Sequence, residues 1–207
     1  MDSIPEIEKE QVVNAYSKIA FDFSRTRYKV WPGVRKFIES LPSDYKILEA
    51  GCGNGKNMLI RPQTMIGIDN CQEFVDLCKA KKLDVLLGDI CDIKFDDNTF
   101  DASISVAVIH HLSTEERRIK SVKEMIRVTK KGNPILIEVW GHELNNKSGD
   151  EKQDRIVEWK DQYKKLLCER YYHFFKKEEI IKICETAGLK ISSIIEDTGN
   201  YLIIGNI

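Results

Sequence analysis

Short apolar runs alternate with longer amphipathic segments between residues 46 and 140. Helical spacing of apolar positions predicts helices over 72–80 and 114–129, and a further helix is expected after Gly55. The short runs predict strands, and they are KILEA, MIGID, LDVLLGD, ASISVAV and PILIEVW. Strands that are apolar throughout are covered by helices on both faces. The pattern therefore predicts an α/β fold with a mostly parallel, doubly wound sheet.

The segments on either side of this core are also patterned. Residues 8–23 and 32–41 carry apolar side chains at helical spacing, which predicts an N-terminal helical preface. After the core, the polar stretch 141–155 predicts a flexible loop, and helices are expected around 156–169 and 176–187. The last two runs, KISSIIED and YLIIGNI, flank a Thr-Gly-Asn turn. They predict an antiparallel hairpin at the edge of the sheet.

Composition narrows the classes of function. A chain of 207 residues with 42% apolar side chains suits one domain with one core. The net charge of -1 excludes a uniformly basic nucleic-acid coat, so a nucleic-acid surface has to be a local patch. Without a long apolar run or a secretory signal, we expect no membrane span and a cytoplasmic protein, with the nucleus as a second location. Six scattered cysteines lack zinc-site spacing, so no metal site is expected.

A glycine-rich turn follows the first predicted strand, in the segment ILEAGCGNGKN at 47–57. Such a turn lets a ligand approach the backbone closely. A dinucleotide fingerprint needs glycine where Lys56 stands, and a phosphate-binding P-loop needs glycine and Ser or Thr where Ala50 and Asn57 stand. The pattern E-x-G-x-G-x-G instead resembles the first motif of class I S-adenosylmethionine-dependent methyltransferases.

Acidic residues and histidines end the next three strands, as this resemblance requires. Asp69 lies 20 residues after Glu49, where the ribose diol of an adenosine cofactor would lie. The resemblance implies that Asp89 faces the adenine amine and that His110 and His111 lie beside the transferred methyl group. S-adenosyl-L-methionine is thus the expected cofactor. The cofactor-binding residues implied are Tyr16, Glu49, Gly51, Cys52, Gly53, Asn54, Gly55, Asp69, Asn70, Asp89, Ile90, Ser105 and Val106.

Longer motifs outside the glycine turn narrow the resemblance. The strings YSKIAFDFSRTRYKVWP, SVAVIHHLSTEERR, RYYHFF and EDTGNY are similar to those of the eukaryotic tRNA wobble-uridine carboxymethyl methyltransferases. The resemblance covers nearly the whole chain and implies a single Rossmann-like class I methyltransferase domain, 1–207. Within it, 1–42 forms an N-terminal helical cover over substrate and cofactor, 43–140 the cofactor-binding core, and 156–207 the C-terminal helices and hairpin. The loop 141–155 is shorter than this family leads us to expect.

The family esterifies a 5-carboxymethyl group on the wobble uridine of tRNA. Its nucleophile is a carboxylate that is already ionised at neutral pH, so no general base is required. The resemblance implies catalytic roles for Arg25 and Arg27, which would align the carboxylate, and for His110 and His111. Two alternatives stay open. The arginines could instead belong to a surface cluster at the helix end, and the histidines could serve mainly to shape the pocket. The substrate residues implied are Tyr28, Lys29, Trp31, Arg170, Tyr171, Tyr172 and His173.

Two partners follow from the same resemblance. One is the anticodon loop of tRNA, for which the basic aromatic segment 160–177 is the expected contact. The other is a small zinc-containing methyltransferase activator protein, expected along edge strand 83–87, unless the chain's own helices cover that strand. The alternatives that stay open are a small-molecule methyltransferase of the same fold and a cofactor-binding subunit without catalytic activity.

Overall fold

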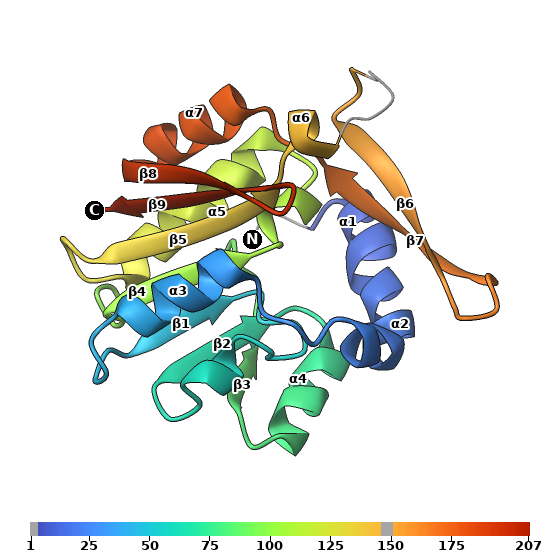
Figure 1. Cartoon of the computed structure of the whole chain (residues 1–207), viewed down its shortest axis with the longest axis horizontal. Helices are drawn as coiled ribbons and strands as arrows, with labels where there is room; N and C mark the ends of the chain where they lie inside the picture. Colours follow the sequence, from blue (N-terminus) through green and yellow to red (C-terminus); the bar gives the residue numbers. More distant parts are fainter. Residues whose placement is uncertain (1–3, 146–150) are drawn as a thin grey trace.

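Seven strands form one sheet in the order β3-β2-β1-β4-β5-β9-β8 (Figure 1). The structure is a computed structural model that describes residues 4–145 and 151–207. Strands β1 to β5 pair in parallel, whereas β9 runs antiparallel to both β5 and β8. Both the doubly wound parallel sheet and the C-terminal hairpin at its edge are confirmed. The strands are β1 Ile47–Ala50, β2 Met65–Asp69, β3 Asp84–Leu87, β4 Ala102–Val106, β5 Pro134–Trp140, β8 Lys190–Asp197 and β9 Asn200–Asn206.

Helices cover both faces of the sheet. On one face, α3 (Pro32–Ser40) and α4 (Gln72–Ala80) pack over Ile47 and its neighbours in one apolar cluster. On the other face, α5 (Glu115–Val128) and α7 (Lys177–Ala187) pack over Leu48 in a second cluster. Adjacent residues of β1 therefore enter opposite cores, which is why the central strands are apolar throughout.

The expected helix after Gly55 is wrong. Only one turn of 3-10 helix, Met58–Ile60, follows the glycine turn. Pro62 stands two residues beyond it, and proline restricts the residue before it and cannot donate a backbone hydrogen bond, so a longer helix cannot form there.

The N-terminal preface lies across the end of the sheet where the parallel strands finish (Figure 1). It consists of α1 (Glu6–Glu8), one π-helical stretch (Lys9–Val13) and α2 (Asn14–Thr26). Tyr16, Ile19 and Ala20 of α2 are buried in a third apolar cluster together with Phe74 and Trp159. Two further short helices are η3 (Ile109–His111) and α6 (His142–Asn145).

The helix expected around 156–169 is also wrong, because the segment is a two-stranded antiparallel sheet. Strands β6 (Asp154–Lys160) and β7 (Leu166–His173) form a hairpin beside α1 and α2 (Figure 1). Trp159 stands opposite Cys168, packs on Phe23, and donates from its indole Nε1 to Asp22 Oδ2 at 2.8 Å. This tertiary contact with α2 favours the strand, although the apolar residues of the segment are spaced as in a helix. The part of the predicted loop at 146–150 lies outside the described residues.

Within the described parts of the chain, no helix is long and apolar enough to cross a membrane. In the same residues, no three His, Cys, Asp or Glu side chains gather closely enough to hold a metal ion.

Candidate functional site

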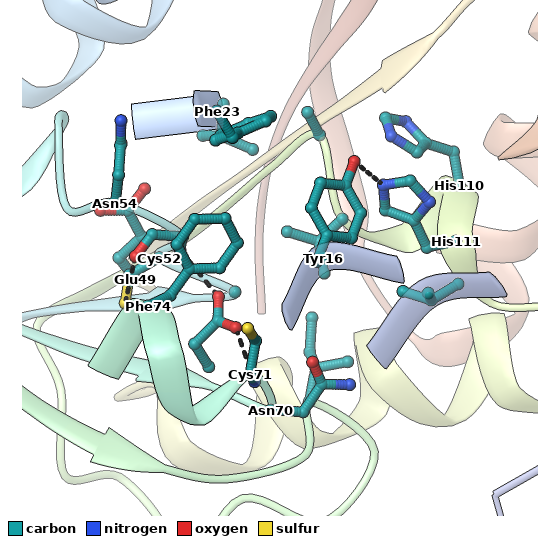
Figure 2. Close-up of a pocket in the computed structure, with 18 of the residues that line it drawn as sticks. Tyr16, Phe23, Glu49, Cys52, Asn54, Asn70, Cys71, Phe74, His110 and His111 are labelled. Atoms are coloured by element: carbon teal, nitrogen blue, oxygen red, sulfur yellow. Dashed lines mark hydrogen bonds between the residues drawn. The ribbon is translucent and has the colours of Figure 1, made fainter. Parts of the chain in front are cut away.

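A pocket opens beyond the carboxyl ends of β1, β2 and β4, beneath the N-terminal helices (Figure 2). Its walls come from the glycine turn, from the residues after β2 and β3, from η3, and from β7. Parallel α/β sheets bind ligands at this end, because there the loops between strands and helices converge.

The glycine turn brings backbone, rather than side chains, to the pocket. Gly51 has a φ of +81°, and a Cβ placed there would lie 2.3 Å from Val108 Cγ2. Gly53 has a φ of +52°, yet a Cβ there would meet no atom within 4 Å. The shape of the turn therefore depends on residues with positive φ, and at Gly53 the turn leaves open space for a ligand.

Glu49 lies under this turn, and only one of its two carboxyl oxygens has a hydrogen-bond partner among the described residues. Its Oε1 accepts from Asn57 Nδ2 at 2.6 Å, whereas its buried Oε2 has no partner among the described residues. Burial raises the pKa of Glu49 to about 8. An orphaned carboxyl oxygen in a pocket wall is suited to a cationic group of a ligand.

Asp69 at the end of β2 holds the turn and the following loop together. Its Oδ2 accepts from the Gly53 amide at 2.7 Å, and its Oδ1 accepts from the Cys71 amide at 3.0 Å. Burial raises the pKa of Asp69 to about 6, partly offset by these backbone hydrogen bonds. Asn70, between them, is exposed and lines the pocket.

Asp89 after β3 is tied to the N-terminal helix through Arg117 of α5. The guanidinium of Arg117 donates from Nη2 to Asp89 Oδ2 at 3.1 Å and from Nε to Glu8 Oε2 at 2.9 Å. Glu8 also accepts from the amide and hydroxyl of Ser113. Glu8 and Asp89 both line the pocket, so this network fixes one of its walls.

An aromatic and histidine cluster forms the opposite end. His111 Nδ1 lies 2.8 Å from the Tyr171 carbonyl oxygen, which can only accept, so Nδ1 carries the proton. His111 Nε2 is then free to accept from Tyr16 Oη at 3.0 Å (Figure 2). Burial lowers the pKa of His111 to about 3, and it lowers the pKa of His110 well below its ordinary value. Both rings are therefore neutral at physiological pH.

Tyr172 packs against two rings at the same end, and those two rings also contact each other, with centroids 5.7 Å apart. Its ring lies 4.7 Å from Trp140 and 5.0 Å from His110, each with an interplanar angle of 29°. Trp140 is the last residue of β5 and lines the pocket. The apolar run of β5 predicts a buried strand, and it does not indicate that this strand contributes a residue to the pocket. The three rings form an apolar wall to which a planar ligand can stack.

Arg170 is a buried cation beside this wall, only 5% exposed. Its Nη1 donates to Tyr172 Oη at 2.7 Å and to Tyr16 Oη at 3.3 Å, while its Nε has no partner. Within the described chain, Arg170 forms no ion pair with a carboxylate, and the phenolic oxygens keep its pKa above the ordinary value although burial opposes the charge. A buried guanidinium in this state is an incomplete anion site.

The structure brings most of the predicted site residues to the pocket, although lining it does not test their roles. Seven lie elsewhere. Arg25 pairs with Asp22 at 2.6 Å on the surface of α2, and Tyr171 and His173 both hydrogen-bond Asp154 outside the pocket. Gly55 and Ser105 are packed beneath the turn and within β4, and Tyr28 and Lys29 line a second cavity next to the pocket. The lining residues predicted are Tyr16, Arg27, Trp31, Glu49, Gly51, Cys52, Gly53, Asn54, Asp69, Asn70, Asp89, Ile90, Val106, His110, His111, Arg170 and Tyr172.

Other lining residues were not predicted. In the sequence, Lys56 serves only to exclude a dinucleotide fingerprint. A lysine inside a glycine-rich, ligand-binding turn also indicates a residue that faces the ligand. Glu8 and Phe74 gave no sequence signal, because helical spacing marks both equally well as surface or core positions. The remaining lining residues of this kind are Val12, Phe23, Asn57, Cys71, Gly88, Ala107, Val108, Leu112 and Trp140.

Comparison with known proteins identifies the family. The family model described as "Methyltransferase domain" matches residues 48–137. A tRNA (carboxymethyluridine(34)-5-O)-methyltransferase of Schizosaccharomyces pombe is 38% identical over 96% of this chain and 97% of its own length. The chain belongs to this methyltransferase family. A relative of the same name from Arabidopsis thaliana is 46% identical over 70% of this chain, which corresponds to 36% of that longer protein.

Solved structures of low sequence identity share the fold. A chain in the complex between the Haloferax volcanii Trm112 methyltransferase activator and a putative methyltransferase superposes with a TM-score of 0.69. The two are 15% identical, and the match covers 95% of this chain and 98% of that chain. The family member described here therefore has the architecture of known methyltransferases over almost its whole length.

Proposed function

We propose that this chain methylates the 5-carboxymethyl group of the wobble uridine in tRNA, with S-adenosyl-L-methionine as the methyl donor. The names of the relatives from Schizosaccharomyces pombe and Arabidopsis thaliana support this substrate. The product would be a methyl ester. A carboxylate oxygen of the substrate would bond to the methyl carbon as the bond from that carbon to the sulfonium sulfur breaks, and S-adenosylhomocysteine would leave.

The pocket fits the cofactor at several points. The orphaned Oε2 of Glu49 suits the ammonium of the methionine part, and the open space at Gly53 admits close contact with the backbone. Asp69 and Asp89 provide acceptors for the ribose hydroxyls and the adenine amine. When bound, the cofactor supplies a methyl group activated on a sulfonium. The neutral rings of His110 and His111 would not repel that positive charge.

The observation that carries the substrate assignment is the buried, acid-free guanidinium of Arg170. A carboxymethyl group is ionised at neutral pH and needs an oriented cation rather than a base. Arg170 lines the pocket, and Tyr16 and Tyr172 accept from its Nη1, so the guanidinium is held in place without a carboxylate partner among the described residues. The uracil ring would stack on the wall of Trp140, Tyr172 and His110.

Arg27 is the second guanidinium that reaches the pocket. It lies over the Trp159 ring at 4.9 Å, and it forms no ion pair with a carboxylate of the described chain. We propose that Arg27 binds a carboxylate in the site together with Arg170. Arg25, which is paired with Asp22 outside the pocket, keeps no part in this proposal.

The expected protein partner would bind along β3. This strand pairs only with β2 among the described residues, and Leu86 and Leu87 are 47% and 57% exposed. The Haloferax volcanii protein that shares this fold was solved as a complex with a methyltransferase activator. An added strand from a small zinc-containing activator would satisfy the free backbone groups of β3 and cover both leucines.

Mass spectrometry of nucleosides tests the function. tRNA lacking this methylation is incubated with the protein and S-adenosylmethionine labelled in its methyl group, and the nucleosides are then analysed. We expect the label on 5-carboxymethyluridine, in a form that mild alkali releases because an ester is hydrolysed. An alkali-stable methylated base, or labelling of small molecules but not of tRNA, contradicts the proposal. Cofactor binding without any transfer would indicate a non-catalytic subunit.

A further inference from the structure

A second cavity adjoins the pocket. Its lining comes from the segment between α2 and α3 and from the glycine turn, and comprises Thr26, Arg27, Tyr28, Lys29, Trp31 and Lys56. Three of these residues, Arg27, Trp31 and Lys56, also line the main pocket. The two cavities therefore share part of their walls.

Hydrogen bonds fix the position of this segment on the glycine turn. Asn54 Nδ2 donates to the Arg27 carbonyl at 3.0 Å, and the Lys56 amide donates to Asn54 Oδ1 at 3.2 Å. Lys56 Nζ lies over the Trp31 ring at 4.1 Å. The cavity is thus a defined feature between two connected loops.

The charges in this cavity are all positive. Neighbouring arginines have acidic partners, since Arg25 pairs with Asp22 and Arg35 pairs with Glu39. By contrast, Arg27, Lys29 and Lys56 form no ion pair with a carboxylate in the described part of the chain. Burial lowers the pKa of Lys56, the carboxylates of Glu49 and Glu138 oppose this shift, and the charge of Arg27 adds a smaller lowering. A bound anion would favour the charged lysine and offset its desolvation.

We propose that this cavity binds a backbone phosphate of the RNA next to the wobble nucleotide. The proposal rests on the proposed function, because a base that enters the main pocket leaves its own phosphates at the mouth. S-adenosylmethionine carries one carboxylate and no phosphate, so one cation suffices for it and the other cations here are left for a further anion. Lysine recognises phosphate as a point charge, which suits Lys29 and Lys56. Tyr28, 65% exposed, would offer a ring on which a neighbouring base can stack.

Lysine variants test the site by direct binding. An anticodon stem-loop RNA with 5-carboxymethyluridine is titrated against protein saturated with S-adenosylhomocysteine, with fluorescence anisotropy as the readout. We expect Lys29→Gln and Lys56→Gln each to weaken RNA binding about fivefold to tenfold and to reduce the slope of log K against log salt by about 1. The matched control is Lys190→Gln, an exposed lysine of β8 that forms no ion pair with a described carboxylate, and it should change neither quantity.

A chemical change in the RNA identifies the phosphate. A methylphosphonate replaces one charged phosphate, on the 5′ or the 3′ side of the modified uridine, by a neutral group. At one of the two positions it should weaken binding to the wild type about fivefold to tenfold. It should have little further effect on the double variant Lys29→Gln/Lys56→Gln, because the partner charges are already absent.

Three results would overturn the phosphate site. The first is wild-type affinity in both lysine variants, and the second is fully additive losses for lysine and phosphate changes. The third is a loss of S-adenosylmethionine affinity in Lys56→Gln as large as the loss of RNA affinity, which would assign that lysine to the cofactor. The binding assay needs no turnover. Phosphate-dependent RNA binding without methyl transfer would therefore contradict the proposed function alone, and methylation without phosphate dependence would contradict the phosphate site alone.

Discussion

Glu8 and Asp89, which are far apart in the sequence, bind the same guanidinium. Arg117 donates to Glu8 Oε2 at 2.9 Å and to Asp89 Oδ2 at 3.1 Å, and its side chain is largely buried. Glu8 belongs to α1 above the pocket, and Asp89 belongs to the loop proposed to receive adenine. The position of α1 and the position of Asp89 are therefore linked through one side chain.

Replacing this arginine should loosen the pocket without touching the substrate side. We expect Arg117→Ala to lower S-adenosylmethionine affinity about tenfold, because the buried carboxylate of Glu8 and the half-buried carboxylate of Asp89 lose their shared cation. Hydrogen exchange at backbone amides of 9–13 should accelerate, which shows release of the N-terminal helices. Lys123→Ala, an exposed change on the same helix, is the control. Unchanged exchange and affinity in Arg117→Ala would refute the coupling.

Asp69 has the most direct predicted contact with the ribose. Asp69→Ala should weaken S-adenosylmethionine binding about tenfold to hundredfold in calorimetry, because charge-assisted hydrogen bonds contribute roughly 1.5 to 3 kcal/mol. It also removes the acceptor of the Gly53 and Cys71 amides. Asp69→Asn keeps one acceptor oxygen for these amides and should lose less affinity. Tight binding of a nicotinamide dinucleotide by the wild type, or full cofactor affinity in Asp69→Ala, would contradict the assignment.

Cofactor binding should release a proton from Glu49. Its pKa of about 8 in the folded protein lies above the ordinary value of 4.5, so the protonated form predominates at pH 6.5. That contribution to stability is complete below pH 4.5 and is lost as the pH rises through 8. A bound ammonium favours the carboxylate, so binding expels the proton and affinity rises with pH in this range.

Calorimetry at pH 6.5 in buffers of different ionisation enthalpy measures this release. The wild type should release close to one proton per bound cofactor, and Glu49→Gln should release markedly fewer. Equal proton release by the two proteins would show that Glu49 does not meet the ammonium.

The sequence could predict the sheet because each central strand carries its own apolar run, and parallel topology follows from runs that are apolar on both faces. It could not predict the hairpin of β6 and β7. Ile156, Trp159 and Tyr163 stand three and four residues apart, as in a helix, and only the contact of Trp159 with Phe23 and Asp22 of a distant helix selects the strand. Arg25 stands three residues after Asp22 on α2 and pairs with it, a spacing that the sequence already contains, whereas Arg27 follows the last residue of the helix.

One set of variants distinguishes the contribution of Arg170 to turnover from that of the arginines near the end of α2. Arg170→Ala should reduce kcat/KM for tRNA at least hundredfold while S-adenosylmethionine affinity changes less than threefold, because the guanidinium acts on the substrate carboxylate. Arg170→Lys keeps the charge but loses the fork, and should recover only part of the activity. Arg25→Ala, at an exposed ion pair, should stay close to wild type.

Thermal unfolding provides the control for folding, since Arg170 also contacts Tyr16 and Tyr172. If folded Arg170→Ala is fully active, or if Arg25→Ala is the variant that loses activity, the carboxylate is bound elsewhere.

The exposed edge of the sheet gives the last prediction, for a partner that binds along β3. Leu86→Lys/Leu87→Lys places two charges on the expected contact and should weaken association with a small zinc-containing methyltransferase activator at least tenfold, as measured by sedimentation. Leu59→Lys, at another exposed leucine that lies outside any strand, is the matched control and should bind normally. Binding of the partner should also stiffen the loop of Gly88, Asp89 and Ile90 after β3, so that the cofactor affinity of the wild type rises when the activator is present. A wild-type chain that is monodisperse alone and binds S-adenosylmethionine equally well with and without the activator would remove the basis for this partner.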